Sequence, residues 1–273
     1  MRGPEISNEQ RAKKLAEEFR TKHGLGDGPI KDMFELVHAA VGVDVISMQA
    51  GEAEHGLSMI DPASGRTVIA VATTPHPMRQ RSSIAHELGH LVAGDLEGEA
   101  VLTPGDRNPA EICADAFARH LLLPLGGANR HCEQIAGAIS LQDLSDLVQE
   151  FEVSPRMATI QLRTLGRIDT ARGEEWGAMS AAHLAARFGW LNQYHSLTTD
   201  SERPRAPQRL MTRAVEGYRR GVVGLTELAR WYGMDASELE EQVGPVPEVE
   251  VERDDDWDSD APLFPGGKAG PAT

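Results

Sequence analysis

Two histidines spaced one helical turn apart, with a glutamate beside the first, are the side chains best suited to chemistry. His86, Glu87 and His90 lie within the segment HELGH. Positions i and i+4 share a helix face, so His86 and His90 can present ring nitrogens to one metal ion. Glu87 projects about 100° round the helix from His86, which suits contact with a metal-activated water better than ligation. The pattern is typical of a hydrolytic zinc site with Glu87 as general base.

A third protein ligand is expected, because two imidazoles alone do not make a catalytic zinc site. The segment 109–124, PAEICADAFARHLLLP, has a helical pattern and carries Glu111 and Asp115, again spaced i and i+4. We expect Glu111 to be the third ligand and Asp115 to accept the N–H of a ligating histidine. A competing interpretation makes Glu111 a helix-start carboxylate that the macrodipole favours.

Other third ligands can be ranked. Asp95, five residues after His90, is the reserve ligand. The metzincin pattern needs Gly and His three and six residues after the second histidine, but Ala93 and Leu96 stand there, which excludes that class.

Two further side chains on the segment 109–124 are predicted to pack in the core. His120 and Cys113 lie about 180° and 200° round a helix from Glu111, so they face away from a site that Glu111 serves. Gly89, inside HELGH, is expected to leave room above the metal. The donor to a developing oxyanion stays open among His55, His76 and the tyrosines.

The elements around these residues follow from periodicity and turn chemistry. Ser7 and Gln10 resemble a capping box, which begins a helix over residues 8–22. A second helix is predicted from residue 33, and the metal helix over 79–93. The segments GLSMI and TVIAVA are predicted strands joined as a hairpin, and VDVISM is β-prone.

The rest of the chain is predicted to be mostly helical. Residues 141–165 have a helix-turn-helix pattern that recurs weakly near residues 225–239 and more faintly near residue 185. Residues 196–208 resemble a linker, and residues 245–273 have too few apolar side chains to fold.

Composition limits the functional classes. The net charge of -15 disfavours nucleic acid and anionic membranes as partners, although eight acidic residues within 248–260 hold much of it. No apolar run is long enough to span a membrane and no signal peptide is evident, so we expect a cytoplasmic protein. The two cysteines, Cys113 and Cys132, are expected to be buried free thiols.

The blocks HELGH and EICADAFARHLLLP together resemble the ImmA/IrrE family of metallopeptidases. The family pattern has a basic and apolar lead into HELGH, here RQRSSIAHELGHLV, followed by a second block and a Leu-Leu-x-Pro-type ending. The resemblance covers roughly residues 8–168. The second block matches at these positions: Glu111, Ala114, Phe117, Ala118, Leu122, Leu123 and Pro124.

The resemblance implies an α+β, zincin-like fold in which the active-site helix packs on a small antiparallel sheet, with one zinc ion held by His86, His90 and Glu111 and with Glu87 as the catalytic glutamate. We predict a metallopeptidase domain over 1–127, a helix-turn-helix-like subdomain over 128–170, a helical extension over 171–244 and a disordered acidic tail over 245–273.

The resemblance also implies a regulatory endopeptidase that cleaves, or triggers the loss of, a helix-turn-helix transcriptional repressor, with a role in mobile elements, toxin-antitoxin modules or stress response. The extension after residue 168 departs from the family pattern, which leaves substrate recruitment open. The alternative is a non-catalytic zinc-fold regulator that binds a repressor or DNA through its helical region.

Overall fold

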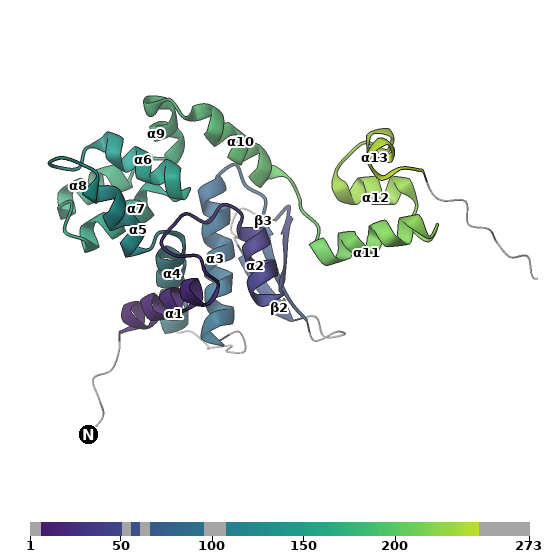
Figure 1. Ribbon diagram of the computed structural model, residues 1–273, viewed down its shortest axis with the longest axis horizontal. Helices are drawn as coiled ribbons and strands as arrows, with labels where there is room; N and C mark the ends of the chain where they lie inside the picture. The colour runs from purple at the N-terminus through teal and green to yellow at the C-terminus, as the bar shows by residue number, and fades with distance from the viewer. Residues whose placement is uncertain (1–6, 51–55, 61–65, 96–107, 246–273) are drawn as a thin grey trace, which may run out of the picture.

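The computed structural model describes residues 7–50, 56–60, 66–95 and 108–245. The elements run in this order: α1 (Asn8–Lys22), α2 (Met33–Val41), β1 (Asp44–Met48), β2 (Gly56–Ile60), β3 (Thr67–Ala72), α3 (Pro77–Ala93), α4 (Pro109–Leu122), α5 (Leu125–Glu133), α6 (Leu141–Phe151), α7 (Pro155–Thr164), α8 (Thr170–Gly177), α9 (Ala181–Phe188), α10 (Leu191–Glu202), α11 (Gln208–Arg219), α12 (Leu225–Tyr232) and α13 (Ala236–Val243). The chain is mostly helical and has a three-stranded sheet, whose strands β2 and β3 Figure 1 shows beside α2 and α3.

The α+β class is confirmed, but the sheet is mixed and not antiparallel as predicted. Its strand order is β1-β3-β2. The hairpin is correct, since β2 and β3 pair antiparallel with Leu57 opposite Ala70. β1 pairs parallel to β3, with Val45 opposite Ile69. Alternating apolar residues identify a strand but not its direction, which depends here on β3 inserting between the two strands that precede it in the sequence.

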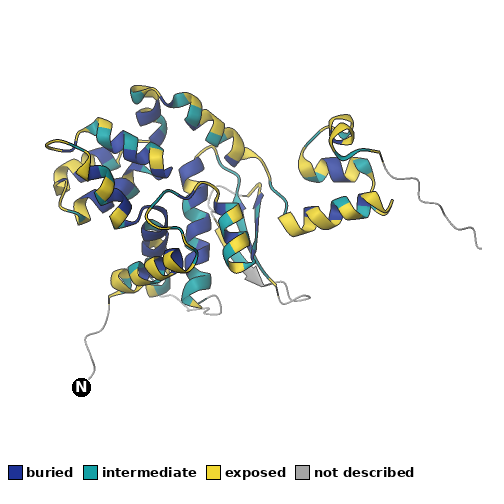
Figure 2. Ribbon diagram, viewed as in Figure 1, coloured by how far each residue is buried: buried dark blue, intermediate teal, exposed yellow. Residues whose placement is uncertain are grey.

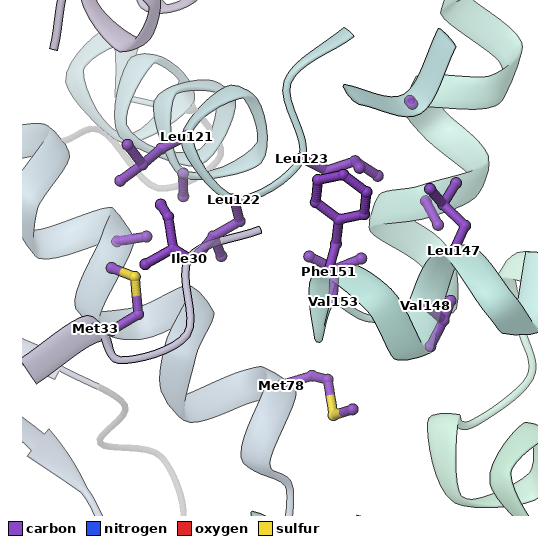
Figure 3. Close-up of a cluster of buried hydrophobic side chains, with 14 of the residues drawn as sticks. Ile30, Met33, Met78, Leu121, Leu122, Leu123, Leu147, Val148, Phe151 and Val153 are labelled. Carbon is purple, nitrogen blue, oxygen red and sulfur yellow. The ribbon is translucent and has the colours of Figure 1, made fainter. Parts of the chain in front are cut away.

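The metal helix α3 lies in the middle of the main hydrophobic core. Ile84 and Leu88 on α3 are almost fully buried, as are Ile69 and Val71 on β3. Figure 3 shows apolar side chains from the loop before α2, from α3, and from the ends of α4 and α6 gathered in one cluster. Figure 2 shows that α3 is buried along much of its length, so its register is fixed by packing on several sides.

A buried arginine fixes the end of α4 to the end of α1. Arg20 is 3% exposed, and its guanidinium donates to the backbone carbonyls of Gly26, Gly28 and Leu121. Burial lowers the pKa of Arg20 to about 10, with the charge of Asp27 opposing the shift. Arg20 therefore stays charged at neutral pH and holds the helix that carries Glu111.

A second buried arginine joins the start of α3 to the end of α6. Arg81 Nη1 lies 3.1 Å from Glu152 Oε2, and both side chains are about one tenth exposed. The same guanidinium donates to the carbonyls of Ile30, Lys31 and Glu152. Glu152 has a φ of +52°, a left-handed conformation in which glycine is more usual. The ion pair explains why a glutamate stands at this helix end.

The predicted linker over 196–208 is wrong for most of its length, because α10 continues to Glu202. Serine and threonine disfavour helices when their hydroxyls compete for backbone groups. In α10 the hydroxyls of Ser196, Thr198 and Thr199 instead donate to carbonyls four residues earlier in the same helix. Ser201 is also buried and its hydroxyl donates to Thr74 O. The irregular connection is thus limited to residues 203–207.

Hydrophobic packing divides at residues 203–207. One buried cluster extends from Ala12 to Tyr194, and a second joins α11, α12 and α13, which Figure 1 shows apart from the rest. The predicted domain boundaries at residues 127 and 170 both fall within the first cluster. They remain predictions.

All of the predicted tail except Pro245 lies outside the described residues. Within the described ranges, no helix combines the length and apolar character needed to cross a bilayer.

Replacing Glu152 should destabilise the protein. Glu152→Ala leaves the buried Arg81 without its carboxylate while the left-handed backbone stays strained, so we expect a loss of about 3 kcal/mol in the free energy of unfolding. Urea denaturation followed by circular dichroism measures it. Glu175→Ala, an exposed glutamate on α8, is the control and should change stability by less than about 0.5 kcal/mol. Equal stability of the two variants would contradict the role of the ion pair.

Candidate metal centre

The candidate centre lies where α3 meets α4. α3 begins with Pro77 at its first turn and ends at Gly94, whose φ is +71°. α4 begins with the Asn108 side chain accepting from Ala110 N, followed by Pro109 at the first turn. These signals place both histidines in the second half of α3 and place Glu111 in the first turn of α4.

Gly89 allows the two helices to approach each other closely. A Cβ atom built on Gly89 would lie 3.0 Å from Phe117 Cδ1 and 3.2 Å from Ala114 Cα, both on α4. Gly89 therefore faces α4, and the expectation that it leaves room above the metal is wrong. The physical reason is that Gly89 and Glu87 project to opposite sides of the direction shared by His86 and His90, and the side of Gly89 is the one that packs on α4.

Three side chains converge on one point across this contact. His86 Nε2 and His90 Nε2 are 3.1 Å apart. Glu111 Oε2 lies 3.2 Å from His86 Nε2, and Glu111 Oε1 lies 3.3 Å from His90 Nε2. These residues form a group whose ligand atoms all lie within 4.8 Å of one another. The structure thus brings together the three residues that the sequence proposed as ligands.

Carboxylates on the outer side orient both imidazoles. Asp115 Oδ1 lies 2.9 Å from His86 Nδ1, and Asp95 Oδ1 lies 2.8 Å from His90 Nδ1. A carboxylate accepts a hydrogen bond, so this arrangement favours the tautomer with the proton on Nδ1 and a lone pair on Nε2. Both Nε2 lone pairs then point to the same place as the Glu111 carboxylate.

The charges around His86 act on its protonation. Burial disfavours the imidazolium, but the hydrogen bond to Asp115 and the negative charges of Asp115, Glu111 and Glu87 outweigh burial and raise the pKa of His86. A protonated Nε2 cannot bind a metal, so metal binding must displace that proton.

The donor set fits a zinc ion. Two imidazole nitrogens and one carboxylate are ligands that zinc accepts, and ligands about 2.0 to 2.1 Å from a tetrahedral ion are about 3.3 Å from one another. The observed separations between the proposed ligand atoms, 3.1, 3.2 and 3.3 Å, agree with that ligand-to-ligand distance. Without a cation, lone pairs of nitrogen and oxygen would face one another at contact distance, which is electrostatically unfavourable.

Glu87 lies beside this group under the edge strand β2. Ser58 Oγ donates to Glu87 Oε2 at 2.7 Å. A Cβ atom built on Gly56 would lie 3.0 Å from Glu87 Oε1, so glycine allows β2 to pass close to the carboxylate. Glu87 is 9% exposed, which keeps its carboxylate in a defined position at the cavity wall. Neither Ser58 nor Gly56 was expected from the sequence, because nothing in the strand pattern marks them.

A cavity of about 610 Å³ opens over the centre. Of the candidate oxyanion donors, His76 and the three tyrosines do not line it, and His55 lies outside the described residues. Arg79 is the basic side chain on its described wall. The lining residues are Gly56, Leu57, Ser58, Arg79, Ser82, Ser83, His86, Glu87, His90, Asp95, Asn108, Ala110, Glu111 and Asp115.

The competing residues lie where they cannot complete the group. Asp95, the reserve ligand, contacts the outer nitrogen of His90 and does not reach the metal-facing side. His120 is 3% exposed and its Nε2 lies 2.8 Å from Glu9 Oε1 on α1. Cys113 is buried in the core, and both cysteines are free and buried, as predicted. His120 and Cys113 are buried, as the sequence predicted. Asp95 was the reserve metal ligand, but it contacts His90 from the outer side.

Comparison with known proteins agrees with this geometry. Residues 39–163 match the family model described as the IrrE N-terminal-like domain, a peptidase family. The match contains α3 and α4 but begins after α1, so it is shorter than the stretch 8–168 that the motifs suggested. None of the curated protein sequences matches the chain.

A methyl group at Gly89 should force α3 and α4 apart. Alanine usually stabilises a helix interior by up to about 1 kcal/mol relative to glycine. Gly89→Ala should instead destabilise the protein by about 1 to 3 kcal/mol, because the core is overpacked, and should weaken zinc binding about tenfold by displacing Glu111. Urea denaturation and competition with a chromophoric chelator measure the two effects.

Gly28→Ala is the matched control, since an added Cβ there meets nothing within 4 Å. That variant should keep the zinc affinity of the unmodified chain. A Gly89→Ala protein that is as stable as the control and binds zinc equally well would contradict the packing argument.

Proposed function

We propose that this chain, whose residues 39–163 match the IrrE N-terminal-like domain model, is a zinc-dependent endopeptidase of the ImmA/IrrE type that cleaves a regulatory protein. The observation that carries the proposal is the convergence of His86 Nε2, His90 Nε2 and the Glu111 carboxylate within 3.3 Å of one another, with Glu87 beside them. His86, His90 and Glu111 are the proposed ligands of one ion, and Glu87 is the proposed general base.

The residues divide the chemistry among them. His86, His90 and Glu111 would hold a zinc ion, whose Lewis acidity would polarise the scissile carbonyl and acidify water. Glu87 would accept a proton from the attacking water on a carboxylate oxygen and then deliver it to the leaving amine. Ser58 holds the carboxylate through Oε2, which leaves Oε1 for the proton transfer. Asp115 and Asp95 keep the imidazole nitrogens unprotonated on the metal side.

The cavity wall indicates an extended peptide as substrate. β2 is the edge strand next to the centre, and its residues Gly56, Leu57 and Ser58 line the cavity. An edge strand can pair with an extended segment through its free backbone groups. Arg79 lies two helical turns before His86 on the same face of α3 and adds positive charge to the cavity wall.

The substrate we propose is a helix-turn-helix transcriptional repressor, whose loss would induce genes that respond to stress. This step rests on the family resemblance and on the size of the cavity, which accepts one extended segment and not a folded domain. The partner is thus a protein with an exposed or locally unfolded cleavage segment.

Replacing the general base should separate metal binding from turnover. Glu87→Gln keeps the size of the side chain and removes its basicity, so we expect about one zinc per chain and a loss of cleavage of about 100-fold or more. Terminal-labelling mass spectrometry of cells that express either form identifies the cut proteins, and elemental analysis counts zinc. Cleavage sites that persist unchanged with Glu87→Gln would assign the activity to another site.

Removing the Ser58 hydroxyl should affect catalysis without affecting the metal. Ser58→Ala deletes one hydrogen bond to Glu87, so kcat should fall about tenfold while zinc content and KM stay unchanged. Ser83→Ala removes a hydroxyl from the same cavity wall and should change kcat less than about twofold. Equal rates for both alanine variants would show that Ser58 does not position Glu87.

A further inference from the structure

The lobe formed by α11, α12 and α13 contains a groove that the metal centre does not use. Its volume is about 1040 Å³. Apolar side chains on its surface include Val222, which is 80% exposed, and Tyr232, which is 41% exposed, with Trp231 beside them. Figure 2 shows that α11 is exposed along most of its length. Large apolar side chains left open in this way mark a binding surface.

The groove is strongly basic in an acidic protein. Residues 203–220 contain six arginines and one acidic residue, Glu216, whereas the whole chain has a net charge of -15. Four of the six arginines line the groove, namely Arg205, Arg213, Arg219 and Arg220. The arrangement combines concentrated positive charge with an apolar floor.

Two of these arginines lack a carboxylate partner within the described part of the chain. Glu216 pairs with Arg220 at 2.8 Å, and Arg205 lies over the Phe34 ring with its Cζ 4.5 Å from the centroid. Arg213 and Arg219 are exposed, and no ion pair joins them to any described residue. Their charges are therefore available to an acidic ligand.

We propose that this groove binds the acidic segment of the chain's own tail, residues 248–260. The segment contains eight acidic residues and one basic residue. Valines and a tryptophan are interleaved with the acids, at positions Val249, Val251 and Trp257. Acidic side chains suit the arginines, and the apolar side chains suit the floor formed by Trp231 and Tyr232.

The tail is attached to the lobe close to the groove. Tyr218 on α11 donates its hydroxyl to Gly244 O at 3.0 Å, so the chain leaves the lobe beside the groove helix. Four extended residues from Gly244 to Glu248 span up to about 14 Å, and twelve residues of α-helix are about 18 Å long. The tether also gives an effective concentration on the order of millimolar, so modest affinity is enough for occupancy.

The metal cavity is a poorer site for the same segment. Four carboxylates line it, from Glu87, Asp95, Glu111 and Asp115, against the one guanidinium of Arg79. An acidic peptide would be repelled there unless it bound the metal ion directly. The tail is thus expected on α11 and not over the catalytic centre.

Nucleic acid is also disfavoured as the occupant of this lobe. In a helix-turn-helix unit the second helix enters the groove of DNA, and α13 would have that place here. Its exposed side chains include Glu238, Glu240 and Glu241, which repel phosphates.

Peptide binding to full-length variants tests the proposal. The probe is a fluorescein-labelled synthetic peptide of residues 246–262, and the readout is fluorescence anisotropy at low and high salt. In a tail-neutral variant of unchanged length, amides replace the acidic side chains of residues 248–260. The chain's own tail then no longer competes with the peptide for the groove. Its substitutions are Glu248→Gln, Glu250→Gln, Glu252→Gln, Asp254→Asn, Asp255→Asn, Asp256→Asn, Asp258→Asn and Asp260→Asn.

The tail-neutral protein should bind the peptide at least tenfold more tightly than the unmodified chain, and added salt should weaken the binding. Adding Arg213→Glu and Arg219→Glu should abolish it. The matched control adds Arg156→Glu and Arg187→Glu, two exposed arginines elsewhere with the same change in charge, and should still bind. Thermal unfolding checks that each variant is folded.

Three outcomes would overturn the proposal. The first is equal binding of the peptide to the unmodified and tail-neutral chains. The second is binding that survives Arg213→Glu and Arg219→Glu. The third is a tail-neutral chain that binds a short RNA or DNA duplex through these arginines but not the peptide.

Discussion

The close contact between α3 and α4 at Gly89 is the constraint on which the metal centre depends. A glycine opposite Ala114 and Phe117 lets two helices from separate parts of the chain pack with little between them. At that distance a glutamate in the first turn of α4 reaches two imidazoles on α3. Arg20 fixes the far end of α4, and Arg81 fixes the start of α3 to α6. The ligands are thus held by packing remote from them, as a preorganised site requires.

Electrostatics connects this packing to function. Carboxylates of Asp95, Asp115, Glu111 and Glu87 surround the two imidazoles, so negative charge is concentrated around one point. A divalent cation at that point would offset the repulsion among these carboxylates, so their charges favour metal binding. The site is therefore built for a cation, and Ser58 holds the one carboxylate that the proposed mechanism requires to stay off the metal.

Local patterns in the sequence predicted the parts of the centre that depend on one helix or one hairpin. His86 and His90 share a helix face, and Glu111 was chosen because a second helix follows at a suitable distance along the chain. The contacts that depend on how elements meet could not be predicted this way. Gly89 was assigned to the wrong face, Asp95 to the wrong role, and Ser58 was missed, because each position depends on the approach of α4, the loop after α3, or β2.

The same distinction applies to the fold. Capping signals and periodicity gave the bounds of α1 and the β2–β3 hairpin, whereas the parallel pairing of β1 and the extent of α10 depend on tertiary contacts.

The most direct test of the account is anomalous diffraction at the zinc edge from crystals of the zinc-loaded chain. We predict one peak bonded to His86 Nε2, His90 Nε2 and a carboxylate oxygen of Glu111. A peak at another site, or one without Glu111 among its ligands, would contradict it.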